Sequence, residues 1–155
     1  MNNTERMFGF EVLAVNKIGE AVIEIDEFGT IRYFNMKGKC HREDGPAVEY
    51  TDGHKEWYKN GKSHREDGPA VECVNGPKYW FKNGLLHREN GPAAEYADGE
   101  KWWIKNGLLH REDGPAVELA DGDKEYFYND KKYMGIKTNE EWISMVKKLK
   151  EEDNK

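Results

Sequence analysis

A seven-residue motif that recurs four times is the feature that most constrains the fold of this chain. The motif reads His-Arg-Glu-Asp/Asn-Gly-Pro-Ala, and its copies follow one another every 23 residues without an insertion. The copies occupy residues 41–47, 64–70, 87–93 and 110–116. A unit of this length is one supersecondary element that cannot bury an apolar face alone, so successive units are expected to stack on one another.

Turn dipeptides divide every unit into short segments. One set comprises Asp52-Gly53, Asn75-Gly76, Asp98-Gly99 and Asp121-Gly122, and a second set comprises Asn60-Gly61, Asn83-Gly84 and Asn106-Gly107. Such dipeptides favour two-residue hairpin turns in which both residues adopt positive φ. The segments between them are about five residues long, a length typical of strands rather than helices. We predict strands over 47–50 and 55–59, and either a short strand or an ordered loop over 62–66.

The two ends of the chain depart from the repeat. Residues 22–26 and 29–34 resemble a degenerate zeroth hairpin, and residues 10–15 are expected to add an edge strand. Near the other end, Thr138 and Glu141 form a capping box. Apolar residues then follow at helical spacing, at Trp142, Met145, Val146 and Leu149. This helix is expected to cover the last sheet edge, with the charged tail 150–155 solvated.

The predicted fold is therefore all-β, an elongated meander of β-hairpin repeats with a C-terminal amphipathic capping helix. Its predicted regions are 1–37 (N-terminal strands and zeroth hairpin), 38–130 (four repeats) and 131–155 (helix and tail). Hydrophobic residues make up only 37% of the chain and charged residues 35%, and the mean hydropathy is -1.00. Such values alone would indicate disorder, but the 5 Trp, 8 Tyr and 6 Phe favour a thin folded array.

Composition also limits the classes of partner. A net charge of -6 disfavours nucleic acid held by bulk electrostatics. The sequence has no run of 18 apolar residues and no signal-peptide pattern over 1–11, so we expect a cytoplasmic protein without a membrane partner. Two cysteines, Cys40 and Cys73, indicate no disulfide framework.

The motif resembles that of the His-Arg-Glu-Asp-Gly-Pro-Ala repeat proteins of large tailed phages and giant viruses. More distantly, the units are similar to MORN-type repeats, which fold as successive β-hairpins. The resemblance covers about residues 38–130. It implies a β-hairpin array of viral origin and little about activity. The role it favours is that of a phage accessory protein, in the host cytoplasm, that binds and inhibits a host component such as a defence protein.

The residues themselves do not favour catalysis or metal binding. The sequence has no nucleophile motif, glycine-rich phosphate loop or convergent metal set, so we predict no enzyme, no cofactor and no metal. Equivalent histidines of successive units are expected on the order of 10 Å apart, whereas zinc ligands lie about 2.0–2.1 Å from the metal. We predict instead a structural loop, in which Asp44 caps the turn at Gly45 and Arg42 pairs with a glutamate. Lysines and glutamates of paired strands, represented by Lys55 and Glu49, are expected to neutralise one another.

Two aromatic columns point to a binding surface. Adjacent strand positions face opposite sides, so the column Trp57, Trp80, Trp103, Tyr126 and the column Tyr58, Phe81, Ile104, Phe127 lie on different faces. One face then needs a cover, either from the sheet curling on itself, from a second copy, or from a partner or ligand. The central units are the more apolar. The candidate binding residues are Tyr79, Trp80, Leu85, Trp102, Trp103 and Leu108, with His64, Arg65, His87, Arg88, His110 and Arg111.

Three functions remain open at this point. The array binds a host protein or another copy of itself, it sequesters a small nucleotide-like ligand by stacking and Arg/His hydrogen bonds, or it is a structural virion component. That the central leucines simply pack between units is an equally good interpretation.

Overall fold

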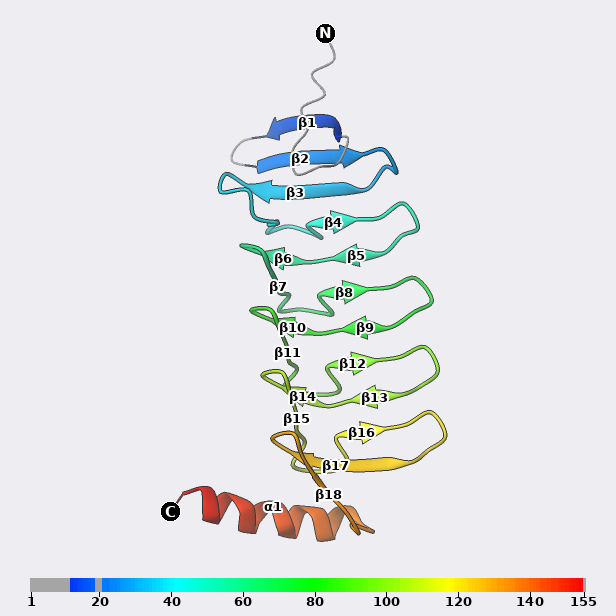
Figure 1. Ribbon diagram of the computed structural model, residues 1–155, viewed down its shortest axis with the longest axis vertical. Helices are drawn as coiled ribbons and strands as arrows, with labels where there is room; N and C mark the ends of the chain where they lie inside the picture. Colours follow the sequence, from blue (N-terminus) through cyan, green and yellow to red (C-terminus); the bar gives the residue numbers. More distant parts are fainter. Residues whose placement is uncertain (1–11, 19–20, 155) are drawn as a thin grey trace. The chain divides into compact units, whose positions relative to one another are not determined.

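The computed structural model describes residues 12–18 and 21–154 (Figure 1). Residues 1–11 of the predicted N-terminal region lie outside the described residues, as do 19, 20 and 155. The chain divides into two units, Met1–Gly84 and Leu85–Lys155, which are described separately below. In both units antiparallel strands succeed one another in chain order, and the single helix among the described residues comes last. The predicted all-β hairpin repeat fold with a C-terminal helix is confirmed.

The N-terminal unit begins with three longer strands, β1 (Val12–Ile18), β2 (Ala21–Asp26) and β3 (Ile31–Asn35). β2 and β3 form the predicted zeroth hairpin, and β1 is the predicted edge strand over its described part. Shorter strands extend the sheet in the order β4, β5, β8, β9. Their bounds are β4 (Val48–Glu49), β5 (Lys55–Glu56), β8 (Val71–Glu72) and β9 (Lys78–Tyr79).

A second, smaller hairpin branches from each repeat before the last. β6 (Tyr58–Lys59) pairs with β7 (Lys62–Ser63) outside the main sheet of the N-terminal unit, which ends with β10 (Phe81–Lys82). The predicted strand 55–59 is therefore wrong as one element, because it divides at Trp57 between two sheets. Trp57 donates its N–H to the Ala70 carbonyl, and its own carbonyl accepts from the His64 N–H. The segment 62–66 is a strand only over β7 and continues as a loop.

The two sets of turn dipeptides form different turns. In the second set Asn60 and Gly61 both adopt positive φ, 53° and 80°, as a two-residue turn requires. In the first set Gly53 has a φ of 91° but Asp52 does not share the positive φ. Tyr50 and His54 close a three-residue loop there, and the Asp52 carboxylate accepts the His54 N–H at 3.0 Å. The predicted two-residue turn is wrong at this position because the aspartate bonds its own backbone two residues on.

The C-terminal unit repeats this arrangement. Its sheet runs in the order β12 (Ala94–Glu95), β13 (Lys101–Trp102), β16 (Val117–Glu118), β17 (Lys124–Tyr128), β18 (Lys131–Tyr133). β11 (Leu85–Leu86) opens the unit, and β14 (Ile104–Lys105) pairs with β15 (Leu108–Leu109) as a small hairpin. In its last repeat β17 runs unbroken through the position of the earlier division.

Helix α1 (Asn139–Asp153) closes the C-terminal unit. Thr138 is its N-cap and accepts the Glu141 N–H at 3.2 Å, so the predicted capping box is confirmed at its first bond. Trp142 is 0% exposed and packs with Val146 against Tyr126 of β17. Its indole N–H donates to the Arg111 carbonyl at 2.9 Å. The charged tail is exposed over residues 150–154 as predicted, although α1 extends through most of it and Lys150 pairs with Glu112 at 2.5 Å.

The alanine of each motif is fully buried, at positions 47, 70, 93 and 116. Both backbone groups of Ala70 are used, since its N–H donates to the Tyr79 carbonyl and its carbonyl accepts from Trp57, each at 2.8 Å. The chain therefore passes closely between two neighbouring strands, and only a small side chain fits. Among the described residues, no helix combines the length and the apolar character needed to cross a bilayer.

Candidate functional site

The arginine of each motif ties its own loop together. Arg42 donates from Nε to Asp44 at 2.9 Å and from Nη1 to Glu49 at 2.7 Å and to the Pro46 carbonyl at 3.2 Å. Arg65 and Arg111 make the same three bonds in their loops. The predicted pairing of Arg42 with a glutamate is confirmed, within its own unit. Asp44 binds this arginine rather than the turn at Gly45.

The geometry accounts for the other motif residues. A Cβ at Gly45 would lie 3.1 Å from the Arg42 Cζ, so glycine leaves the room in which the guanidinium lies. The hydrogen bond from Arg42, together with its charge, holds the pKa of Asp44 below its usual value. Lys55 does lie opposite Glu49 in the sheet register, but the carboxylate of Glu49 pairs with Arg42. The predicted Lys–Glu neutralisation is therefore corrected to an Arg–Glu one.

The same arginines cover an aromatic column. Arg42 lies over the Tyr33 ring, Arg65 over Trp57 and Arg111 over Trp103, each with Cζ 4.0 Å from the ring centroid. A cation over a ring face is attracted by the ring quadrupole and shields the ring from water. The sequence analysis considered three ways of covering an exposed aromatic face, and a layer of arginines from the chain itself was not among them. A signal for it was present, because an arginine follows each of these two tryptophans by eight residues.

The histidines hold the two-residue turns. His41 accepts the Asn60 N–H on Nδ1 at 3.1 Å, and its Nε2 lies 3.2 Å from Glu43. His64 accepts from Asn83 in the same way, and His87 from Asn106. This bonding places the ring proton on Nε2. His110 lies 2.7 Å from the Asn129 side chain. No group of three or more potential metal ligands occurs among the described residues.

Grooves lie between successive motif loops. In the N-terminal unit a groove of about 490 Å³ is lined by Arg42 and Arg65 with Trp57 between them. In the C-terminal unit a groove of about 390 Å³ is lined by Arg88 and Arg111 with Trp103. The arginines lie inside and the aspartates outside, since the side chain of Arg42 is 24% exposed and that of Asp44 84%. Carboxylates therefore dominate the rims that an incoming ligand would meet.

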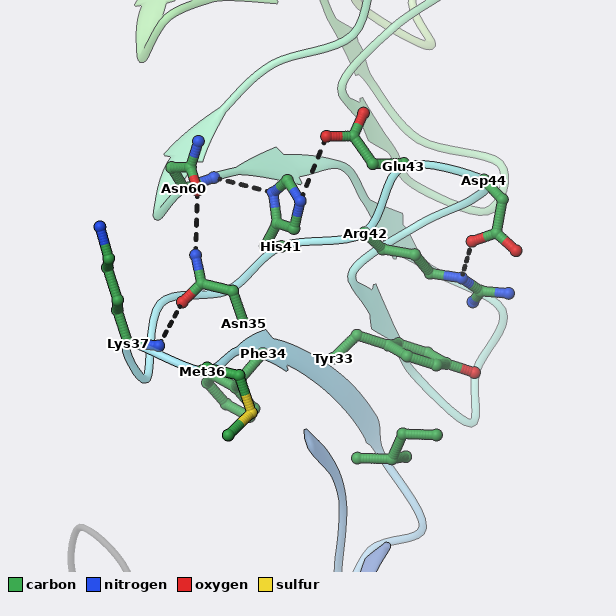
Figure 2. Close-up of a pocket in the computed structure, with 11 residues that line it drawn as sticks. Tyr33, Phe34, Asn35, Met36, Lys37, His41, Arg42, Glu43, Asp44 and Asn60 are labelled. Carbon is green, nitrogen blue, oxygen red and sulfur yellow. Dashed lines mark hydrogen bonds and ion pairs between the residues drawn. The ribbon is translucent and has the colours of Figure 1, made fainter. Parts of the chain in front are cut away.

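A further pocket of the N-terminal unit lies beside the first motif loop (Figure 2). It has a volume of about 650 Å³, and Ile23, Tyr33 and Met36 are among the apolar residues that line it. Figure 2 shows Asn35 bridging this wall to Asn60, with the Asn35 Nδ2 donating to the Asn60 Oδ1 at 2.9 Å. One motif loop lines this pocket, whereas two line the groove of 490 Å³. The sequence analysis did not predict this pocket, and the only signal for it was the loss of the motif before residue 41.

A tyrosine–glutamate cluster of the N-terminal unit also escaped prediction. Glu56 accepts from the Tyr58 hydroxyl at 2.8 Å and from the Tyr50 hydroxyl at 3.3 Å. Burial, with Glu56 adding to it, raises the pKa of Tyr58 to about 12. Burial also raises the pKa of the Cys40 thiol. A thiol kept protonated is a poor nucleophile.

The predicted binding residues do not form one surface. In the C-terminal unit, Trp103, His110 and Arg111 line its groove. Trp102 instead donates its indole N–H to Glu100, and its ring centroid lies 5.7 Å from that of Tyr96. His87 is buried, and Arg88 bonds to Glu95 and to the Pro92 carbonyl. In the N-terminal unit, His64 and Arg65 line the groove, and Tyr79 and Trp80 are half-buried.

Leu85 and Leu108 differ from the rest of the set because they are 51% and 41% exposed. They occupy the same position in consecutive small hairpins, and Leu85 lies against Gly107, the residue before Leu108. We call these two residues the leucine strip. The interpretation that they pack between units holds in part, since Leu85 covers the following turn yet keeps half its surface in water. The N-terminal unit has lysine at this position, at Lys39 and Lys62, packed on Gly61 and Gly84.

Comparisons of the chain with protein-family models, with curated proteins and with solved structures gave no match. The candidate surfaces are therefore the grooves between the motif loops, the pocket beside the first loop and the leucine strip. Of these, the leucine strip presents two large apolar side chains to solvent at the same position of consecutive repeats.

Proposed function

We propose that this chain is a non-enzymatic binding protein whose partner is another protein. In the setting that the motif resemblance suggests, it is a phage accessory protein that binds and inhibits a host component, such as a defence protein, in the host cytoplasm. The observation that carries the proposal is the leucine strip. Two leucines about half exposed stand in register where the preceding repeats have lysine. Apolar side chains in an otherwise charged surface are typical of interface centres.

The grooves support a protein partner over a nucleotide-like ligand. Their arginines already donate to aspartate, glutamate and a backbone carbonyl of their own loops. A phosphate would have to displace these acceptors and approach past exposed carboxylates, which repel it. The pocket beside the first motif loop is the one observation that favours a small ligand, because Phe34, Met36 and the cationic Lys37 are among the residues that line it.

The magnitude expected from the leucine strip is modest and measurable. Full burial of a leucine contributes about 1.5–3 kcal/mol, so burying the exposed half of each side chain contributes about 1 kcal/mol. Loss of both would weaken binding by about 2 kcal/mol, or about thirtyfold in Kd. A charged side chain introduced in place of either leucine would weaken binding further, because its charge would lose water in the interface.

The test replaces the leucine strip by the residue that the chain itself has at this position. The variant Leu85→Lys/Leu108→Lys is compared with wild type in capture experiments from extracts of the cells that make the protein. Any protein that wild type retains and the variant loses is then purified, and its Kd for both is measured by calorimetry. The matched control is Lys39→Leu/Lys62→Leu, which makes the opposite exchange in the N-terminal unit and should leave the Kd unchanged.

Two outcomes would contradict the proposal. An unchanged Kd for Leu85→Lys/Leu108→Lys, with its circular dichroism equal to that of wild type, would exclude the leucine strip as the interface. A wild-type chain that is dimeric in light scattering and becomes monomeric in this variant would assign the strip to self-association. Native mass spectrometry of protein from infected cells separates the small-ligand alternative, and presence in purified particles would favour a virion component.

A further inference from the structure

Five asparagines of this chain precede glycine, and this pair has a characteristic chemistry. They are Asn60, Asn75, Asn83, Asn90 and Asn106. When glycine follows asparagine, no side chain hinders its backbone nitrogen from reaching the asparagine Cγ. Attack there expels the side-chain amide as ammonia. The reaction requires that the glycine N–H lose its proton, so a hydrogen bond that holds this N–H opposes it.

Four of the five pairs are held in this way. The N–H of Gly61 donates to the Cys40 carbonyl at 2.8 Å, that of Gly84 to Ser63 at 2.9 Å and that of Gly107 to Leu86 at 2.8 Å. The Gly76 N–H donates to the Cys73 carbonyl at 3.2 Å. The asparagines at 60, 83 and 106 are fixed as well, because each donates its backbone N–H to a motif histidine.

Asn90-Gly91 differs from the other four pairs. It lies in the third motif loop, where Asn90 replaces the aspartate of the other copies and is exposed. The Gly91 N–H has no hydrogen-bond partner among the residues that the structure describes. Gly91 has a φ of 128°, whereas the glycines of the other three motifs have no positive φ. A Cβ at Gly91 would lie 3.2 Å from the Arg88 Cζ, so the Arg88 guanidinium lies beside the Gly91 Cα.

We propose that Asn90 is a site of spontaneous deamidation in the folded protein. The Gly91 nitrogen loses its proton to solvent and bonds to the Asn90 Cγ, the Cγ–Nδ2 bond breaks, and ammonia leaves. Water then opens the resulting succinimide. Cleavage of the new N–Cγ bond gives aspartate, and cleavage of the original peptide bond gives isoaspartate. Overall one water is consumed and one ammonia released, with no oxidant or cofactor.

The aspartate product converts the third motif to the sequence of the other three. In those loops the arginine Nε donates to the aspartate Oδ1 at 2.9, 2.8 and 2.7 Å. We expect an aspartate at position 90 to accept from Arg88 in the same way once the loop takes the backbone conformation of the other three. The net charge of the chain would change from -6 to -7, since one neutral amide becomes one carboxylate. The modification thus adds a carboxylate beside Glu89 at the rim of the C-terminal groove.

The experiment follows all five asparagines in one sample. Folded protein is incubated at mildly alkaline pH in water enriched in ¹⁸O, digested, and analysed by peptide mass spectrometry, because each hydrolysed succinimide incorporates one labelled oxygen. We expect Asn90 to convert about fivefold faster than Asn60, Asn83 and Asn106, the factor that a hydrogen bond of about 1 kcal/mol represents. In denaturant the five rates should converge. Equal rates in the folded protein would overturn the proposal.

Two variants separate the loop from the sequence pair. Asp67→Asn places a new Asn-Gly pair in a motif loop of the N-terminal unit, and we expect it to deamidate faster than Asn83 of the same unit. A rate equal to that of Asn83 would refute the claim that the loop permits the reaction. Asn90→Asp imitates the product and should unfold at the same or a higher urea concentration than wild type. A lower midpoint would refute the regained Arg88 pairing.

Discussion

Removal of the Trp142 side chain should be among the most destabilising single changes in the C-terminal unit. Trp142 is 0% exposed, and the centroids of Tyr126 and Tyr133 lie 5.4 and 5.5 Å from its ring. Truncation of a buried tryptophan to alanine leaves a cavity and typically costs about 3–5 kcal/mol. Trp142→Phe retains most of the ring but loses the indole N–H that donates to the Arg111 carbonyl. An unsatisfied carbonyl adds about 1–3 kcal/mol, so Phe should fall between wild type and Ala.

The assay is equilibrium urea unfolding followed by circular dichroism, with Ile143→Ala as the matched control. Ile143 is the next residue of α1, is 37% exposed and faces away from the buried cluster. Its truncation should change the free energy of unfolding by about 0.5 kcal/mol. Similar losses for Trp142→Ala and Ile143→Ala would refute the conclusion that α1 closes the last repeat through this side chain. A loss confined to the C-terminal unit, seen by hydrogen exchange, would agree with nearest-neighbour stacking of repeats.

Two further predictions concern the motif core and the helix ion pair. Ala70→Val adds two methyl groups at a fully buried position, so it should lower the free energy of unfolding by about 1–3 kcal/mol, while Ala97→Val in an exposed turn should have little effect in the same urea assay. Lys150 holds the pKa of Glu112 below its ordinary value, so the folded state binds this proton less readily than the unfolded state. The stability from this pair is complete above the ordinary carboxyl pKa of about 4.3 and is lost as the pH falls through the lowered folded value. When the pH falls from neutral through the lowered pKa of Glu112, Lys150→Met should therefore lose less stability than wild type. Identical urea midpoints for the two proteins at every pH would refute the pairing.

Features set within a few residues could be predicted from the sequence. The Asn60-Gly61 turn, the Thr138 cap and the repeat period depend on local φ preferences and short hydrogen bonds, and the structure has them where expected. The prediction for the Asp-Gly turns of the first set was wrong for a reason equally local. The Asp52 side chain competes for the His54 N–H, and composition alone does not rank that bond against a two-residue turn.

Features that depend on contacts between neighbouring repeats could not be predicted from the sequence. Arg65 covers Trp57, and Trp142 reaches Arg111 across 31 residues of chain. A long side chain has many rotamers, and which partner it meets depends on where the backbone of the neighbouring repeat passes. The candidate binding residues therefore have different surroundings. Arg111 covers the Trp103 ring, whereas Leu85 is half exposed to solvent.

By itself the sequence determined that this protein is an array of β-hairpin repeats closed by a helix, because periodic turns and caps act over short distances. Only the tertiary structure decided which aromatic rings are covered, which strand divides at Trp57 and, among the described Asn-Gly pairs, which one keeps an unbonded glycine N–H. The physical reason is that burial and hydrogen-bond satisfaction depend on the spacing between neighbouring repeats. That spacing is fixed only when the repeats have packed against one another.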